Sequence, residues 1–465
     1  MNHRSSLLVL CWTLLVLYAM KTPAQSSPNA GTSLSAVVTE AEKNYPSIHI
    51  TQEELNASAA RLALARTAYL PRLDGIAQFN RGTRNNVFGS LLPQTVVPSM
   101  SGPVIGTNNG GSVWGSAAGL LINWQPFDFG LRHANVTAAM AAQDKARATQ
   151  QRTELEIAAG SADAYLTQLA ALSTRTAAAA AVQNWETLRV SIHALVSAQL
   201  RPGADESRVD AERAAAVNQM ALADEAIETS RATVLKFAPE TGTGTPTSGR
   251  LQAELPDLSN VEAPLVPGEN PAVAEQEASV KQNAAQLHAI ERSWVPQFSL
   301  EAAGYARGTG AETNGQRLSG ANGLAPNISN YVAGINITFP FLDFASIHAR
   351  ESEQSANLRA TKATEDLTVR TLREQFLQAL AAVKAAKTIA ENTPVQVKSA
   401  QTALDQANAR YKAGLAPIDE VAQAQRLLVQ AQIDDSVARL NVWRGFLRLQ
   451  FVRGDLQPFM DQAGR

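Results

Sequence analysis

The sequence is poor in the residues on which many enzymes and disulfide-rich domains depend. It has one cysteine, Cys11, which lies in an apolar N-terminal run, so disulfides and thiolate chemistry are excluded from the rest of the chain. Aromatic residues make up only 6% of the 465 residues, which argues against a thick globular core. The formal net charge is −2 and the basic residues are dispersed, so the electrostatics give no case for nucleic-acid binding.

Long hydrophobic runs are also missing beyond the N-terminus. Residues 1–24 combine a basic start, an apolar stretch and small residues at the end, which is the pattern of a secretory signal peptide. Leu10 precedes Cys11 where a lipoprotein signal has a small residue, so we interpret Cys11 as a passive part of that peptide. No other segment is apolar over the length of about eighteen residues that a membrane helix needs. Any membrane contact is therefore expected to involve β-strands.

The chain does contain a long alternating segment, residues 113–129. Alternation with period two predicts a β-strand, and aromatic residues at both ends of its apolar face are typical of a strand that crosses a membrane. Residues 331–341 alternate in the same way, and we predict that both apolar faces contact lipid. Their large side chains are those of Trp114, Leu120, Ile122, Trp124, Tyr331, Ile335, Ile337 and Phe339.

Long helices are the second feature that is present. No proline occurs from Leu131 to Leu200, and seventy residues at 1.5 Å each predict a helix of roughly 100 Å. Two series of apolar residues recur at alternating steps of three and four, which is the spacing of coiled-coil packing. They are Leu155, Ala158, Ala162, Tyr165, Leu169 and Leu172, and then Val369, Leu372, Phe376, Ala379, Val383 and Ala386. Pro394 follows the second series, where we expect a kink or break.

Ordered matches between the two halves of the chain indicate an internal tandem duplication. The matching segments are 46–71 with 271–296, 125–129 with 340–344, and 211–213 with 424–426, at separations of 225, 215 and 213 residues. Each copy is predicted to run helix, strand, loop, strand and long helical hairpin. The predicted strands are 72–82, the part of 113–129 that precedes a stop at Pro126, 297–308 and 331–341, with exposed loops at 83–111 and 309–329.

The same matches divide the chain into segments. They are the signal peptide (1–24), the first repeat (25–237), a connector (238–269), the second repeat (270–456) and a C-terminal tail (457–465). The connector is rich in proline, glycine and threonine, and we expect it to lie outside the core. Asp128 and Asp343 end the two matched strand segments and are expected to cap the helices that follow.

Four strands of about ten residues are long enough to cross a bilayer but too few to close a barrel. Unpaired backbone groups at a sheet edge in lipid cost several kcal/mol each. Membrane strands would therefore require an oligomer, in which two copies supply eight strands and three copies supply twelve with room for a lumen. The alternative is a periplasmic coiled-coil scaffold or interaction protein with a soluble, half-buried sheet.

The order of these motifs resembles the TolC-like outer membrane efflux proteins, the outer membrane factors of tripartite efflux and type I secretion systems. The segments that carry the resemblance are 411–415 (Tyr-Lys-Ala-Gly-Leu), 424–426, 340–344 and the two Asn-to-Pro helix entries. The resemblance implies a homotrimer in the outer membrane of a Gram-negative-type cell, with a twelve-stranded β-barrel and a periplasmic α-barrel of coiled-coil hairpins. Its implied partners are a periplasmic adaptor (membrane fusion) protein and an inner-membrane transporter of the RND or ABC type.

The resemblance also assigns roles to the two hairpin turns. The turns, the implied region of adaptor docking and gating, contain Arg201, Pro202 and Gly203 in the first copy and Gly414, Leu415 and Ala416 in the second. Arg201 is aligned with Gly414, which makes Pro202 and Gly203 resemble an insertion. The resemblance also implies a pore constriction with weak cation preference just after the second turn, where Glu420 occupies one acidic-ring position and Gln423 the other. Asp419 is the competing candidate, and the alternative for either carboxylate is a solvated residue that the helix dipole favours at a helix start.

The sequence predicts no catalytic, metal or cofactor site. Residues 242–245 (Gly-Thr-Gly-Thr) lack the lysine and the strand–helix context of a phosphate loop. His133 and His348 occupy matching positions in the two copies, but no histidine pair has the helical spacing of metal ligands. We therefore expect a protein that is not an enzyme, and in which a partner supplies the energy for transport.

Overall fold

The computed structural model describes residues 31–83, 111–247, 249–312 and 316–464. The predicted signal peptide and most of the predicted loop at 83–111 lie outside the described residues. The helices are α2 (Leu34–Asn44), α3 (Pro46–Thr67), α4 (Leu131–Ser197), α5 (Gly203–Phe237), η2 (Thr241–Thr243), α6 (Gly249–Ala253), η3 (Pro267–Glu269), α7 (Pro271–Glu291), α8 (Phe344–Lys412), α9 (Ile418–Arg453) and α10 (Gln457–Ala463). The strands are β1 (Arg72–Thr83), β2 (Ser112–Phe127), β3 (Gln297–Thr309) and β4 (Ile328–Thr338).

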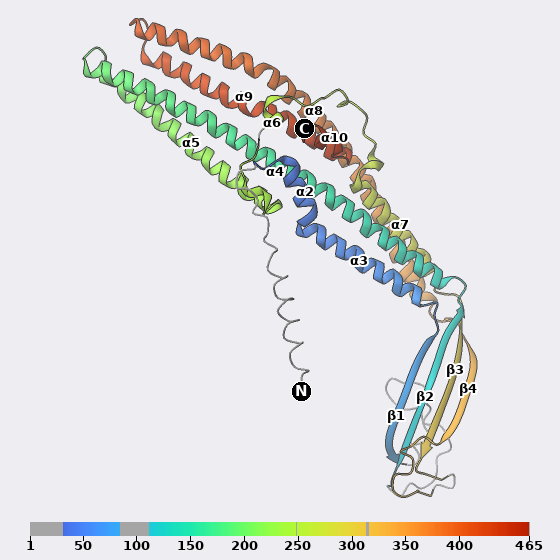
Figure 1. The fold of residues 1–465 in the computed structure, drawn as a ribbon. Coiled ribbons are helices and arrows are strands. Elements are labelled where there is room, and N and C mark those ends of the chain that lie inside the picture. The colour runs from blue at the N-terminus through green and yellow to red at the C-terminus, as the bar shows by residue number, and fades with distance from the viewer. Residues whose placement is uncertain (1–30, 84–110, 248, 313–315, 465) are drawn as a thin grey trace, which may run out of the picture.

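The molecule is long and thin, with the sheet at one end and the tips of two helical hairpins at the other (Figure 1). One hairpin is α4–α5 and the other is α8–α9. The four strands form one antiparallel sheet in the order β1-β2-β3-β4. The helices next to the sheet follow the same order, because α3 packs on α4, α4 on α7, and α7 on α8. Both layers therefore have one edge at β1 and α3, and the other at β4 and α8.

The predicted strands and long helices are confirmed, with shifts at their ends. β2 continues through Pro126, where its pairing with β3 shifts register between Trp124 and Phe127. β4 begins and ends three residues earlier than expected, so Phe339 lies just beyond the strand. None of the described helices has both the length and the apolar character needed to cross a membrane.

The predicted coiled-coil seams form the core. Ala162, Tyr165 and Leu169 of α4 are buried in one cluster with Trp443 of α9, whereas Ala379 of α8 is buried in another. The expectation that the connector lies outside the core is wrong, since Leu251 is buried in the first cluster and Val261 in the second. The C-terminal segment also belongs to the core, because α10 buries Phe459 completely against Trp443 and Phe446.

The break expected at Pro394 does not occur, and α8 continues through it as one helix of 69 residues. Proline removes one helical hydrogen bond and costs about 3 kcal/mol in a helix interior. Packing against α9 on both sides of Pro394 offsets this cost, because Ala390 and Ala400 are buried. Beside the proline, the hydroxyl of Thr393 donates to Oδ1 of Asp435 on α9 at 2.7 Å.

Candidate functional site

The register of the sheet separates an apolar face from a polar face. Leu120 lies opposite Gly304 of β3, which in turn lies opposite Tyr331 of β4, so Leu120 and Tyr331 share a face. The eight residues predicted to contact lipid are all on this apolar side, seven on β2 and β4 and Phe339 just beyond β4. Seven of them are exposed, whereas Trp114 is half-buried with the guanidinium of Arg81 5.0 Å from its ring centroid.

The opposite face carries polar groups along all four strands. Its polar residues include Asp74, Gln78, Asn123, Ser299, Glu301, Asn336 and Thr338. Two contacts order this face near the helices: Nδ2 of Asn123 donates to Oε1 of Glu301 at 3.4 Å, and Arg72 pairs with Asp74 at 2.9 Å. A sheet with an apolar face on one side and a hydrogen-bonding face on the other suits a boundary between lipid and water.

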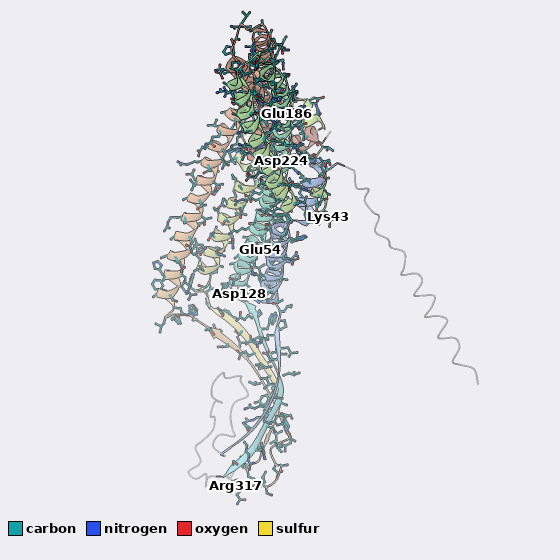
Figure 2. The ribbon with its side chains drawn as sticks, turned by 90° about the vertical axis from the view of Figure 1, so that its left-hand side faces the viewer. Lys43, Glu54, Asp128, Glu186, Asp224 and Arg317 are labelled. Carbon is teal, nitrogen blue, oxygen red and sulfur yellow. The ribbon has the colours of Figure 1, made fainter. Side chains whose placement is uncertain are left out.

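Asp128 lies at the junction between β2 and α4 (Figure 2). It precedes the N-cap residue of α4, Gly130, by two positions, and its side chain caps the first turn of the helix as predicted. Its carboxylate accepts the backbone N–H of Arg132 at 2.7 Å and pairs with the Arg132 guanidinium at 2.8 Å. Burial alone would raise the pKa of Asp128, but the hydrogen bonds from Arg132 and Gly130 outweigh it and lower the pKa. The Arg132 guanidinium also lies 4.9 Å from the ring centroid of Tyr69, so the segment between α3 and β1 contacts the same site.

The second junction differs from the first. Asp343 is the residue before α8, but its side chain makes no capping hydrogen bond, so that part of the prediction is wrong. The residue four positions later is Ile347, which cannot pair with a carboxylate as Arg132 does. The backbone differs as well: Phe129 and Gly130 have positive φ, whereas the matching residues, Phe344 and Ala345, already belong to α8.

The two hairpin tips contain the six predicted turn residues, but the predicted alignment between the tips is wrong by two positions. Gln199 and Gly414 both have positive φ, and Leu200 and Leu415 donate to Leu195 and Arg410 in equivalent backbone hydrogen bonds of 2.9 Å. The match to Gly414 is therefore Gln199, not Arg201, and the separation of 215 residues extends through the tip without an insertion. The proposed match of 211–213 with 424–426 does not fit this spacing.

A cluster centred on Tyr411 joins the two hairpins near their tips. The Tyr411 hydroxyl donates to Oδ2 of Asp205 at 2.8 Å, and the Arg201 guanidinium lies 4.3 Å from the ring centroid and donates to the Tyr411 carbonyl. Burial, followed by the contact with Asp205, raises the pKa of Tyr411 to about 12. We call Arg201, Asp205 and Tyr411 the tip latch. The sequence analysis assigned Arg201 to the first tip and named Tyr411 within the 411–415 motif, but it did not predict their contact, because no local pattern links residues so far apart.

The three constriction candidates lie just beyond the latch. Asp419 is exposed and lies 3.4 Å from Arg208 of the other hairpin, so it adds a second link between the hairpins. Glu420 pairs at 2.9 Å with Arg410 of its own hairpin, and Gln423 is exposed. A third link between the hairpins joins Arg426 to Glu212 at 3.1 Å.

The tips also present surface to a partner. Leu200 and Leu415, at matching positions, are 69% and 72% exposed. A groove lies between α4 and the α8–α9 hairpin, next to the latch. Its polar lining consists mainly of Asn184, Thr187, Ser191, Gln401, Asn408 and Gln425. Gln425 is 5% exposed, and its amide nitrogen has no hydrogen-bond partner among the described residues.

Comparison with known proteins identifies the family. Residues 37–236 and 265–454 match the model of the outer membrane efflux protein family, so the chain belongs to that family. The family consists of channel proteins, and membership places this chain in the outer membrane as a channel subunit rather than a periplasmic scaffold. A search of curated protein sequences gave no match.

Solved structures agree with this fold. The Campylobacter jejuni CmeC outer membrane channel is 13% identical with a TM-score of 0.72, and the alignment covers 93% of this chain and 90% of that one. The outer membrane protein VceC from Vibrio cholerae is 18% identical (TM-score 0.71; 91% and 96% covered). The Neisseria gonorrhoeae MtrE channel in its open state is 17% identical (TM-score 0.71; 94% of each chain).

Proposed function

We propose that three copies of this chain form a passive export duct that runs from the periplasm through the outer membrane. The strongest support is that the sheet and the layer of helices are both open at two edges, one formed by β1 and α3 and the other by β4 and α8. β1 and β4 each pair with one strand among the described residues, and unpaired strand edges are costly in lipid. Three copies supply twelve strands, enough for a barrel with a lumen.

In this assembly the apolar face of the sheet contacts lipid and the polar face lines the lumen. Leu120, Ile122 and Trp124 on β2 then meet the hydrocarbon region, together with Ile335 and Ile337 on β4. Asn123 and Glu301 face the water-filled interior. The duct performs no catalytic step, and the energy for transport comes from a partner.

Gating takes place at the hairpin tips. The latch joins the end of α8 to the start of α5, and the Arg208–Asp419 and Arg426–Glu212 pairs add further links between the hairpins. These contacts hold the two hairpins together and so keep the periplasmic entrance narrow. Asp419 and Glu420 carry negative charge at this entrance, which favours cations weakly in the closed state.

The tips dock a periplasmic adaptor protein, which connects the duct to an inner-membrane transporter of the RND or ABC type. The exposed leucines Leu200 and Leu415 and the polar groove beside the latch support this assignment. Each hairpin tip therefore presents an apolar side chain surrounded by polar groups, which is the usual composition of a protein–protein interface. We expect it to contact the helix ends of the adaptor. The transporter then selects the cargo, because the duct itself has no specific binding step.

The test is extraction, assembly and conductance of the full chain. We expect the protein to stay in the membrane fraction after osmotic shock, to dissolve only in detergent and to have the mass of a trimer. In planar bilayers it should conduct ions with a small single-channel conductance and a low open probability while the latch is intact. Release by osmotic shock without detergent, or a monomer that does not conduct, would contradict the proposal.

A further inference from the structure

The far end of the sheet carries an arginine on its apolar face. β1 leads away from the helices, so its last residues lie at the end of the sheet furthest from the hairpin tips (Figure 1). Arg81 is near that end, and its register partner is Trp114 of β2. Paired residues share a face of the sheet, so Arg81 projects from the side that faces lipid in the proposed assembly. It is exposed, and among the described residues no carboxylate pairs with it.

Two contacts hold the Arg81 guanidinium in place. Nε donates to Oγ of Ser112 at 3.0 Å, and the group lies 5.0 Å from the ring centroid of Trp114. These contacts leave the donors of the two terminal nitrogens for an acceptor outside the chain. A guanidinium presents such donors in a planar fork that matches the oxygens of a phosphate. Arg81 is therefore oriented in advance for an anion, so it loses little side-chain freedom when it binds one.

The depth of this arginine matches the outer headgroup region of a membrane. Trp114 and Trp124 lie ten residues apart on the apolar face of β2. At about 3.3 Å per residue and a tilt of about 45°, they are about 23 Å apart along the membrane normal, close to the apolar band of about 25 Å in outer-membrane barrels. Because the helices are periplasmic, Trp124 marks the inner boundary and Trp114 the outer one. Arg81, beside Trp114, thus lies among the headgroups of the outer leaflet.

A loop adds hydrogen-bonding groups beside the arginine. The described second part of the loop between β3 and β4 folds back onto the apolar face. A side chain on Gly308, the register partner of Ser116, would meet the Ala325 carbonyl oxygen at 2.2 Å. Gly323, with a φ of +91°, lies just as close to the Trp114 carbonyl oxygen. The loop therefore presents exposed polar side chains next to Trp114, those of Ser319, Asn322 and Asn327.

An apolar side chain lies beneath the arginine, towards the membrane centre. Phe79 is two residues before Arg81 on the same side of β1, and it is 64% exposed. We call Phe79, Arg81, Ser112 and Trp114 the outer-rim patch. From the outside inwards, the patch and the neighbouring loop present amides and hydroxyls, then a cation, then an aromatic ring. A lipid whose headgroup is a phosphorylated sugar has the complementary order of groups: sugar hydroxyls, phosphate and acyl chain.

We infer that the outer-rim patch binds the phosphorylated sugar headgroup of an outer-leaflet glycolipid. Arg81 binds a phosphate, the loop side chains contact sugar hydroxyls, and Phe79 packs on the start of an acyl chain. The outer leaflet of a Gram-negative-type outer membrane consists largely of such glycolipids. A phospholipid would satisfy Arg81 but would offer no sugar to the loop. The inference rests on the proposed trimer and its lipid-facing side, and it adds three lipid sites per trimer.

Titration of the full-length trimer in detergent tests the site. The probe is lipid A, a glucosamine disaccharide with two phosphates and several acyl chains, and native mass spectrometry counts the molecules bound. The unmodified trimer should bind three, and Arg81→Gln should weaken binding about tenfold because the charged fork is lost. Arg81→Lys keeps the charge without the fork and should give an intermediate affinity. The matched control is Arg72→Gln, a 77% exposed arginine at the other end of β1 and on the polar face, which should bind lipid A normally.

Two further probes need no variant. Lipid A without its phosphates should bind the unmodified trimer about as weakly as intact lipid A binds Arg81→Gln. Phosphatidylglycerol, which has a phosphate but no sugar, should bind at least about tenfold more weakly than lipid A.

The outcomes separate this site from the proposed trimer. Equal binding of lipid A by the unmodified trimer and Arg81→Gln, or by the intact and dephosphorylated probes, would overturn the inference. Phosphatidylglycerol that binds as tightly as lipid A and is lost with Arg81→Gln would overturn it too, and would assign the patch to a phospholipid. Each of these results leaves the trimer intact. Absence of trimers in the unmodified chain would overturn both.

Discussion

The phenolic oxygen of Tyr411 lies 2.8 Å from Oδ2 of Asp205, and this contact connects the end of α8 with the start of α5. Because the pKa of Tyr411 is raised to about 12, its hydroxyl remains protonated and donates at any physiological pH. The Arg201 guanidinium over the same ring adds a cation–π contact from the other tip. The side chain of Tyr411 thus makes two contacts between the hairpins whose separation opens the duct in the proposed mechanism.

Removing the Tyr411 hydroxyl should favour the open tip. Tyr411→Phe keeps the ring beneath Arg201 but loses the hydrogen bond to Asp205. A hydrogen bond to a charged group contributes about 1.5–3 kcal/mol, so the ratio of closed to open tips should fall by roughly tenfold or more. Single-channel recording in planar bilayers measures this as a higher open probability.

The control for this variant is Tyr45→Phe. Tyr45 stacks on Phe237 at a centroid distance of 5.3 Å, away from the tips, so its hydroxyl has no role in the latch. It should leave the open probability unchanged. If Tyr411→Phe also conducts like the wild type, the latch does not hold the tip closed.

The Asp128–Arg132 pair should stabilise the first junction at neutral pH. Both side chains are 9% exposed, and removing one partner of such a buried pair costs about 3 kcal/mol. We therefore expect Asp128→Asn to lower the free energy of unfolding by about that amount at pH 7, measured by circular dichroism of the detergent-solubilised protein. Asp343→Asn, at the matching but uncapped position, should change it by less than about 0.5 kcal/mol.

The same pair predicts a pH dependence. The pKa of Asp128 is lowered in the folded protein, so its contribution is present above the unfolded pKa of about 4 and is lost as the pH falls through the folded value. The difference between wild type and Asp128→Asn should therefore shrink from pH 7 towards pH 2. A difference that stays constant over this range would show that the carboxylate charge is not the source of the stability.

Much of the fold follows from local sequence patterns. The alternation over 113–129 and the seam from Leu155 to Leu172 each lie within one element, so their periods identify a strand and a helix without tertiary information. The prediction of a break at Pro394 was wrong because it used only the local preference of proline. Helix α8 packs on α9 along its length, and this tertiary packing outweighs the local preference of proline.

The contacts of the candidate site were harder to predict from the sequence than the fold. The tips align only when backbone conformation is known, because Gln199 takes the positive φ that glycine takes at Gly414. The latch joins residues separated by 206 positions, and no local pattern records such a contact. The buried cap at Asp128 depends on Arg132 four residues later, whereas Ile347 occupies that position in the other copy. This difference was visible in the sequence and was missed.

The exposed tip leucines should be required for adaptor docking. Replacing both Leu200 and Leu415 by Asp places charge at each apolar contact, and we expect adaptor binding to weaken by at least about tenfold without loss of the trimer. Copurification of the adaptor with the detergent-solubilised duct measures the effect. Val266→Asp, at a 52% exposed position on the connector, is the control and should bind the adaptor normally. Equal binding by the tip variant would place the docking surface elsewhere.

The two faces of the sheet should respond differently to charge. Leu120 is 57% exposed on the apolar face, and an arginine on a lipid-facing strand costs about 2–4 kcal/mol at the bilayer midplane. Leu120→Arg should therefore impair assembly, seen as loss of trimers from the outer membrane. Asn123→Asp lies on the opposite face, where the new carboxylate meets Glu301 in water and costs less than about 1 kcal/mol. It should assemble normally and conduct cations better. Equal assembly of both variants would mean that the face of Leu120 does not meet lipid.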